Sequence, residues 1–409
     1  MRHDVNEPIA DLPLPPVPAM RLGHTATWLL GDGRSFSDVR PFIASLAEHL
    51  QRDGVAVDRL NLVLAAMHPQ VAAISATWKS DSDLVVVPRS WTGLATQEFK
   101  RSPMALFHQR THLVIRRRIR GDDDVTADDF DILADLRQQG YSDYLALQLG
   151  GLLATRVNAF TIATKRPDGF TDDELHTLLS LQRLLAIVVE AHVDSRIATT
   201  LLCTYLGDDA GARVLAGQVQ RGQGESIRAV VSFCDLRNFT SLSDRLPREA
   251  VLSVLDDTFD AVVAGVAAHG GEVLKFIGDA ALAVFRARPG EEAAACALAH
   301  QACAAVFAGL ADKNRDRGSD DRPLLDLGMS LHVGEVHYGN IGSPSRLDFT
   351  VIGPAVNLAS RLQGLCRPLQ QRVVVSADVA AHLSTSCDDL GLHPLKGIAA
   401  PVRVFSLAV

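Results

Sequence analysis

Residues 272–285 read EVLKFIGDAALAVF, two apolar runs that meet at Gly278 and Asp279. A Gly-Asp pair between runs of strand-forming residues is typical of a β-hairpin, and glycine suits a tight bend. The bend displays a carboxylate, and Lys275 interrupts the first run. Because an unpaired ammonium is costly to bury, Lys275 either reaches the surface along its aliphatic stem or points into a polar site.

A second carboxylate stands at the end of an apolar run upstream of the hairpin. Residues 229–235 read AVVSFCD, and residues 236–240, LRNFT, lead towards a helix. A turn that follows a strand can bind phosphate through its backbone amides, and an aspartate at the strand end can bind a metal ion. A capping or turn aspartate is the alternative interpretation of Asp235.

A strand, a Gly-Pro turn and a helix are expected in residues 347–362, LDFTVIGPAVNLASRL. Asn357 and Arg361 stand four residues apart, so they project from one face of that helix. They form either part of a site or an ordinary solvated surface. Lys396, in the loop PLKGI of residues 394–398, is a further cation.

The rest of this region alternates between the two kinds of element. Besides the hairpin, the pattern predicts helices at 247–268, 291–310 and 355–366, and strands at 227–234, 326–333, 336–341, 347–351, 373–375 and 402–407. Such alternation predicts an α/β (α+β) architecture in which helices pack on a sheet.

Together these segments resemble the class III nucleotidyl cyclase catalytic domain, over roughly residues 226–409. The two carboxylates, the strand lysine, the Asn/Arg pair and the late lysine follow the family's order. Three spacings also fit it: Lys275 to Asp279, Thr350 to Asn357, and Asn357 to Arg361. The resemblance implies a ferredoxin-like βαββαβ core.

The resemblance also implies a role for each residue. Asp235, Asp279 and the backbone carbonyl of Leu236 match the ligands of two Mg²⁺ or Mn²⁺ ions, hard cations that prefer oxygen. Arg361 matches the residue that stabilises charge on the transferring phosphoryl group. Asn357 matches the residue that positions the ribose.

The remaining matches concern the nucleotide. Lys396 and the turn at Phe239 and Thr240 match positions that bind phosphates. Lys275 matches the lysine that approaches N1 of adenine, and Thr350 occupies the second base-reading position, where many members carry aspartate. A hydroxyl can accept from adenine N6, so the resemblance implies an adenylate cyclase that converts ATP to cyclic AMP and pyrophosphate, with some use of GTP left open.

Two positions depart from the family pattern. Asn238 stands where a glycine usually precedes Phe-Thr, which predicts a changed loop conformation. Residues 328–330, Gly-Met-Ser, lack an arginine often found there, so phosphate binding depends more on Arg361 and Lys396.

Family members act as dimers with sites built across the interface, so the expected assembly is a homodimer with two shared active sites. One chain would supply the aspartates, and its partner Lys275, Thr350, Asn357 and Arg361. A guanylate cyclase, a diguanylate cyclase and a catalytically silent regulatory module are the alternatives. Lys275 disfavours a guanylate cyclase. A diguanylate cyclase needs Gly-Gly in the hairpin bend. A silent module would normally have lost a metal ligand or the Asn/Arg pair.

Four regions are expected along the chain: a flexible Pro-rich leader at 1–36, a GAF-like sensor domain at 37–193, a helical connector at 194–225, and the cyclase domain at 226–409. The sensor prediction rests on a helix at 37–52, strands at 74–78, 84–88, 112–119, 144–149 and 159–164, and a long closing helix. Thr171 and Glu174 form a capping-box pattern before that last helix.

Composition narrows the function further. The net charge is −8, so no basic domain suggests binding to nucleic acid. The six cysteines form no C-x-x-C pair, and neither a signal peptide nor an uninterrupted apolar run of membrane-spanning length is present. The sequence therefore predicts a cytoplasmic protein with reduced thiols, no membrane span, and an unknown small-molecule or protein input to its N-terminal domain.

Overall fold

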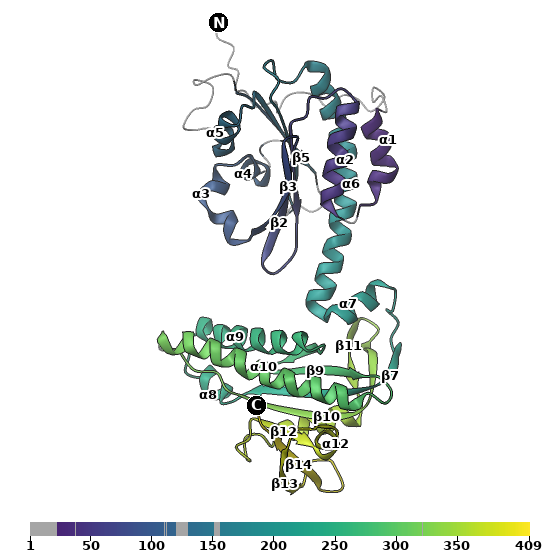
Figure 1. Ribbon diagram of the computed structural model, residues 1–409, viewed down its shortest axis with the longest axis vertical. Helices are drawn as coiled ribbons and strands as arrows, with labels where there is room; N and C mark the ends of the chain where they lie inside the picture. Colours follow the sequence, from purple (N-terminus) through teal and green to yellow (C-terminus); the bar gives the residue numbers. More distant parts are fainter. Residues whose placement is uncertain are drawn as a thin grey trace. The chain divides into compact units, whose positions relative to one another are not determined.

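The computed structural model describes residues 23–36, 38–109, 111, 113–119, 130–150, 156–320 and 322–409. They divide into two compact units, Met1–Leu201 and Leu202–Val409, and each is described by itself (Figure 1).

The N-terminal unit is built on a six-stranded antiparallel sheet. Its strand order is β3-β2-β1-β6-β5-β4. The strands are β1 (Arg59–Ala65), β2 (Val71–Lys79), β3 (Ser82–Ser90), β4 (Val114–Arg118), β5 (Asp143–Leu149) and β6 (Asn158–Thr164). The strands expected at 74–78, 84–88, 144–149 and 159–164 are present, and the one expected at 112–119 is present as β4, with residue 112 outside the described residues. The β1 strand was not predicted.

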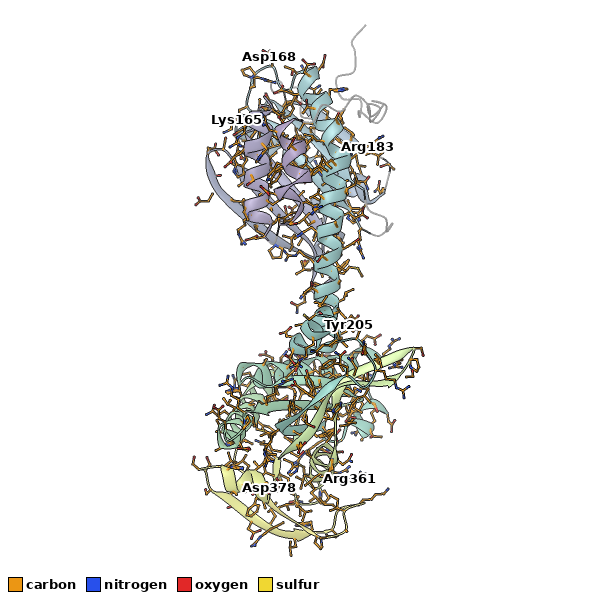
Figure 2. All side chains as sticks on the ribbon, turned by 90° about the vertical axis from the view of Figure 1, so that its right-hand side faces the viewer. Lys165, Asp168, Arg183, Tyr205, Arg361 and Asp378 are labelled. Carbon is orange, nitrogen blue, oxygen red and sulfur yellow. The ribbon has the colours of Figure 1, made fainter. Side chains whose placement is uncertain are left out.

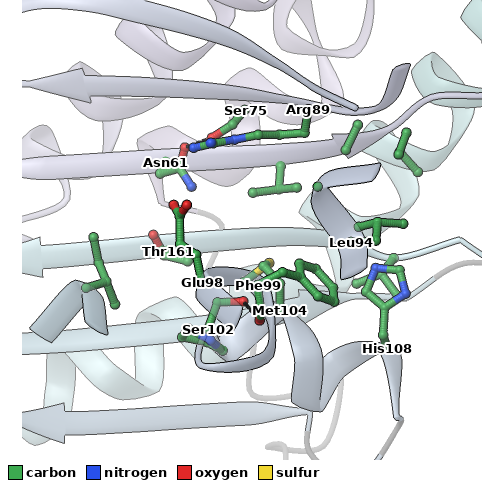
Figure 3. A pocket seen from close by; sticks show the side chains of 18 of the residues that line it. Asn61, Ser75, Arg89, Leu94, Glu98, Phe99, Ser102, Met104, His108 and Thr161 are labelled. Atoms are coloured by element: carbon green, nitrogen blue, oxygen red, sulfur yellow. Dashed lines mark hydrogen bonds between the residues drawn. The ribbon is translucent and has the colours of Figure 1, made fainter. Parts of the chain in front are cut away.

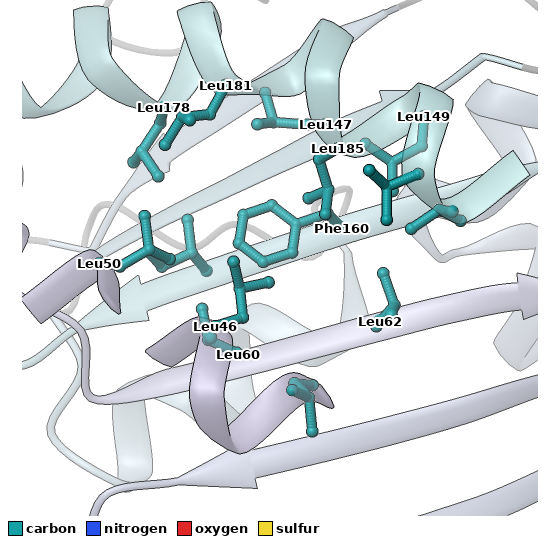
Figure 4. Close-up of a cluster of buried hydrophobic side chains, with 14 of the residues drawn as sticks. Leu46, Leu50, Leu60, Leu62, Leu147, Leu149, Phe160, Leu178, Leu181 and Leu185 are labelled. Atoms are coloured by element: carbon teal, nitrogen blue, oxygen red, sulfur yellow. The ribbon is translucent and has the colours of Figure 1, made fainter. Parts of the chain in front are cut away.

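Helices cover both faces of this sheet (Figure 1). One face carries α1 (His24–Leu30), the short η3 (Asp32–Arg34), α2 (Val39–Arg52) and α6 (Asp172–Leu206). The other carries η4 (Thr92–Ala95), α3 (Gln97–Lys100), α4 (Pro103–His108) and α5 (Asp131–Gln138). Figure 4 shows Phe160 of β6 among leucines of α2, β1 and α6, which form the apolar core of the first face.

The first residues described correct the predicted leader. Residues 24–34 form α1 and η3, and Ala26 and Leu29 are buried in the same core as α2. Seven residues are too short a helix for a periodic pattern to reveal it, and its stability comes from packing. Residues 1–22 lie outside the described residues.

The start of α6 follows the capping-box prediction. The Thr171 amide donates to Glu174 Oε2 at 2.7 Å, and the Glu174 amide donates to Thr171 Oγ1 at 3.3 Å. These bonds satisfy amides that a helix start leaves without helical acceptors. The helix then runs without a break to Leu206, so the first part of the predicted connector is an extension of α6.

The C-terminal unit contains a larger mixed sheet of order β13-β14-β12-β10-β7-β9-β8, with β11 paired to β10. Its strands are β7 (Gly224–Leu236), β8 (Glu272–Ile277), β9 (Ala280–Ala287), β10 (Leu327–Ser343), β11 (Arg346–Ile352), β12 (Val373–Ser376), β13 (Cys387–His393) and β14 (Val402–Leu407). Its helices are α7 (Asp208–Leu215), α8 (Phe239–Ser243), α9 (Arg248–Ala268), α10 (Glu292–Ser319), α11 (Pro354–Gln363) and α12 (Ala377–His382).

The elements β7, α9, β8, β9, α10 and β10 follow the predicted βαββαβ order, with neighbouring strands antiparallel. Alternate residues of β7 face opposite sides: Val230 and Cys234 pack with α9 and α10, whereas Val231 packs with β11 and α11. Among the described helices, α10 alone is long and apolar enough to cross a bilayer. Its apolar residues, such as Cys303 and Val306, lie in the core that it forms with the sheet.

Candidate active site

The strand register brings the two predicted carboxylates together. Asp235 of β7 pairs with Ala280 of β9, so Asp279, in the preceding bend, lies beside it. Burial and then the neighbouring Asp279 carboxylate raise the pKa of Asp235 to about 6, and a hydrogen bond from Gln363 partly offsets them. Two carboxyls held this close in a half-buried place suit a cation.

The donor set around this pair is made of oxygen. The Leu236 side chain is buried, so only its backbone can serve the site. Among the described residues no group of three or more His, Cys, Asp or Glu side chains could hold a metal ion. The two carboxylates fit Mg²⁺ or Mn²⁺, because such ions take further ligands from water and substrate phosphates, and the Leu236 carbonyl stays a predicted ligand.

The turn after Asp235 adopts a left-handed conformation at Asn238, with φ 61° and ψ 20°. Asparagine enters this region more readily than most residues, so it can serve where the family has glycine. The conformation that glycine would permit is therefore present. The α8 helix begins directly afterwards, with Phe239 partly packed on the core and Thr240 exposed.

The helix start leaves backbone donors for a substrate. The first bond of this turn runs from the Leu242 amide to the Asn238 carbonyl at 3.0 Å. The amides before Leu242 precede any helical acceptor, as at every helix start. Phosphate oxygens are suitable partners for such amides.

Lys275 is neither fully exposed nor unpaired. Its Nζ lies 2.5 Å from Oδ2 of Asp348, and the two side chains keep 33% and 48% of their accessible surface. Asp348 precedes Thr350 by two residues on β11, so both lie on the same face of that strand. Thr350 itself is buried. Sequence reasoning selected Thr350 and missed Asp348, although an acidic residue two positions earlier on a strand was the available signal.

The α11 helix places the predicted Asn/Arg pair on its outer face. Pro354 occupies its first turn, after Gly353 with φ 144°. Ala359 is buried on the inner face, whereas the Asn357 and Arg361 side chains are exposed and form no hydrogen bond or ion pair within the described part of the chain. Figure 2 shows Arg361 at the surface of the C-terminal unit.

The remaining predicted residues are not all brought together. Lys396 is exposed in the turn before β14 and makes no hydrogen bond to Asp235 or Asp279 in the described structure. Asp235 is opposite Gly328 near one end of β10, whereas Thr350 is opposite Gly339 towards its other end. Within one chain the metal-binding carboxylates and the base-reading threonine therefore belong to different parts of the sheet.

The βαββαβ sheet and the paired carboxylates at its hairpin are those expected of a nucleotidyl cyclase catalytic domain in the C-terminal half of the chain. Residues 224–407 match the adenylate and guanylate cyclase catalytic domain family.

Several named proteins are similar over this region. An adenylate cyclase of Anabaena cylindrica is 30% identical over 166 residues, which cover 41% of this chain and 33% of that protein. Adenylate cyclase 1 of Rhizobium meliloti is 31% identical over 186 residues, covering 43% and 26%. The crystal structure of the adenylyl cyclase CyaB from P. aeruginosa is 24% identical with a TM-score of 0.39, covering 46% and 96%. The chain thus spans about a third or less of these two curated relatives.

Proposed function

We propose that the chain is an adenylate cyclase that converts ATP into 3′,5′-cyclic AMP and pyrophosphate. The observation that carries this proposal is the Asp235–Asp279 pair at the end of the hairpin that also bears Lys275. The 3′-hydroxyl oxygen of the ribose would attack the α-phosphorus, and pyrophosphate would leave from the opposite side. The sequence relatives named above carry adenylate cyclase in their names, which supports the same reaction.

Each residue has a separate task in this scheme. Divalent ions at Asp235 and Asp279 would lower the pKa of the attacking hydroxyl and neutralise phosphate charge. The Arg361 guanidinium, which has no partner among the described residues, would donate to the oxygens on which charge develops. Asn357, one turn earlier on α11, would hold the ribose in line. The amides at Phe239 and Thr240, with Lys396, would bind the departing phosphates.

Base selection rests on Lys275 and Thr350. An ammonium donates to N1 of adenine, whereas N1 of guanine carries a hydrogen and repels such a donor. The Thr350 hydroxyl can accept from N6 of adenine. Asp348 holds the Lys275 ammonium on the same strand face as Thr350, which favours one direction for the donor.

We further propose that two copies of the chain complete each site. Asp235 and Thr350 lie towards different ends of β10, and the polar face of α11 has no partner among the described residues. A second copy would present its Lys275, Thr350, Asn357 and Arg361 to the carboxylates of the first. A twofold arrangement generates two identical sites, since each chain carries both sets.

The N-terminal unit would act as a GAF-like sensor. Its antiparallel sheet, with helices on both faces and a long closing helix, supports this proposal. The α6 helix continues from that unit to Leu206, just before α7, so it is the element through which a change at the sensor would act.

The test is identification of the product. Purified protein is incubated with ATP or GTP and Mn²⁺, and nucleotides are separated and identified by mass spectrometry. We expect cyclic AMP from ATP as the main product, and a loss of at least about a hundredfold in Asp279→Asn, because an amide binds the cation poorly. Absence of any cyclic nucleotide, or undiminished turnover in Asp279→Asn, would refute the proposal.

A further inference from the structure

A cavity of about 760 Å³ opens on the face of the N-terminal sheet that carries η4, α3 and α4 (Figure 3). This volume falls within the usual range of small-molecule sites. It is separate from the cyclase domain, since its lining runs from Arg59 to Thr161.

The alternation of β1 explains how the cavity gains polar groups. Leu60, Leu62 and Leu64 point into the core against α2 and α6. Their neighbours Arg59 and Asn61 therefore point to the opposite face and line the cavity. The side towards the helices includes apolar Leu94, Phe99 and Met104, together with polar and charged side chains such as Glu98 and His108.

Arg59 carries a donor without an acceptor. Its Nη1 is buried and has no hydrogen-bond partner among the described residues. Burial lowers the pKa of this guanidinium, although an arginine remains charged at neutral pH. By contrast, Arg116 is paired with the buried Asp143 at 2.6 Å. A buried charged donor left unpaired is costly, so the site is suited to an acceptor from outside the chain.

Asn61 adds a second donor. Its Oδ1 accepts from the hydroxyls of Ser75 at 2.8 Å and Thr77 at 3.0 Å. These two bonds occupy the amide oxygen and leave the amide NH₂ group for the cavity. The floor of the cavity, on β1, thus offers a guanidinium and an amide donor, and the opposite side includes the apolar Leu94, Phe99 and Met104.

Three acidic residues line the same space: Glu98, Asp131 and Asp135. The Glu98 carboxylate points towards Asn61 (Figure 3) and forms no ion pair with another described residue. It would repel an anion placed near it and would attract a cation. An experiment can therefore distinguish an anionic ligand from a cationic one.

We propose that this cavity binds a small monocarboxylate with an apolar body, whose carboxylate accepts hydrogen bonds from Arg59 and Asn61. The carboxylate satisfies both donors of the floor, and the apolar body contacts Leu94, Phe99 and Met104. Such a ligand would be the chemical input to the N-terminal unit.

Isothermal titration calorimetry of the full chain tests the proposal with three carboxylates, 3-phenylpropionate, octanoate and indole-3-acetate, and with phenethylamine as the cationic counterpart. We expect at least one carboxylate to bind and phenethylamine not to bind. Arg59→Gln should weaken carboxylate binding at least tenfold, whereas Glu98→Gln should tighten it severalfold by removing repulsion. Arg52→Gln, at an exposed position at the end of α2, is the matched control and should leave binding unchanged.

A second variant guards against misfolding. Ala73→Phe fills the cavity from β2 and should abolish binding even where Arg59 is intact. Arg59→Gln should unfold at a temperature no lower than that of the parent protein, since the buried charge it removes has no partner among the described residues. The proposal is overturned if none of the three carboxylates binds, if phenethylamine binds in their place, or if Glu98→Gln weakens carboxylate binding.

Discussion

Asp235 and Asp279 show how two carboxyls held close together act against the stability of the fold that carries them. A carboxyl whose pKa is raised on folding binds more protons in the folded than in the unfolded state. For Asp235 the window runs from its ordinary value of 3.8 to about 6. The contribution of Asp235 to the free energy of unfolding therefore falls as the pH rises through this window. The resulting destabilisation has reached its full size at pH 7.

Asp235→Asn should consequently stabilise the metal-free protein at pH 7.5, by about 1 kcal/mol once solvent screening of this half-exposed group is allowed for. The advantage should shrink towards pH 4, where the native carboxyl is protonated. Denaturant unfolding in EDTA at the two pH values measures this difference, with Asp388→Asn as an exposed control. With Mn²⁺ present, the parent protein should be more stable than Asp235→Asn, because only the parent protein gains stability from binding the ion. A variant less stable than the parent in EDTA at pH 7.5 would contradict the electrostatic account.

Asp348 is the residue that the sequence did not single out. Its ion pair with Lys275 directs an ammonium that would otherwise sample many rotamers. In Asp348→Asn we expect kcat/KM for ATP to fall about tenfold and that for GTP to change little, so that the ATP/GTP ratio declines. Steady-state kinetics with both nucleotides measures the ratio. Asp348→Glu should retain part of the preference; an unchanged ratio in the asparagine variant would assign the pair a purely structural role.

Elements differ in how much of them could be predicted. The hairpin of β8 and β9 follows from its Gly-Asp bend, and the face shared by Asn357 and Arg361 follows from helical spacing. The β10 strand was expected as two strands separated at Gly334 and Glu335. It is continuous from Leu327 to Ser343, because Gly334 pairs with Ala229 of β7.

Gly334 in β10 is required by packing against another element, which no local sequence pattern reveals. A Cβ at Gly334 would lie 2.7 Å from the Cβ of Ala355, so glycine allows α11 to approach the strand.

The β1 and β13 strands were not predicted from the sequence, for two different reasons. Leucine-rich β1, RLNLVLA, is composed largely of residues that also favour helices, and the edge strand β13 carries exposed acidic residues that resemble a loop.

The proposed assembly has a direct test by mixing. Asp279→Ala and Arg361→Ala chains should each be inactive alone, since one lacks a metal ligand and the other the donor to the phosphoryl group. After the two are mixed, unfolded and refolded together, heterodimers would contain one intact site, and activity should return to about a quarter of that of the parent protein. Size-exclusion chromatography of differently tagged chains confirms heterodimer formation. Inactive mixtures that contain heterodimers would rule out shared sites.

The sequence by itself determined the chemistry that each segment can perform. It indicated two carboxylates, a lysine in the hairpin and an Asn/Arg pair, because these depend on residue type and on spacing within one strand, bend or helix. Only the tertiary structure decided which groups meet: Asp235 beside Asp279, Asp348 on Lys275, and Arg59 in a cavity lining, its Nη1 without a hydrogen-bond partner in the described part of the chain. Such meetings depend on strand register and sheet order, which join residues far apart in the chain and leave no mark in a local pattern.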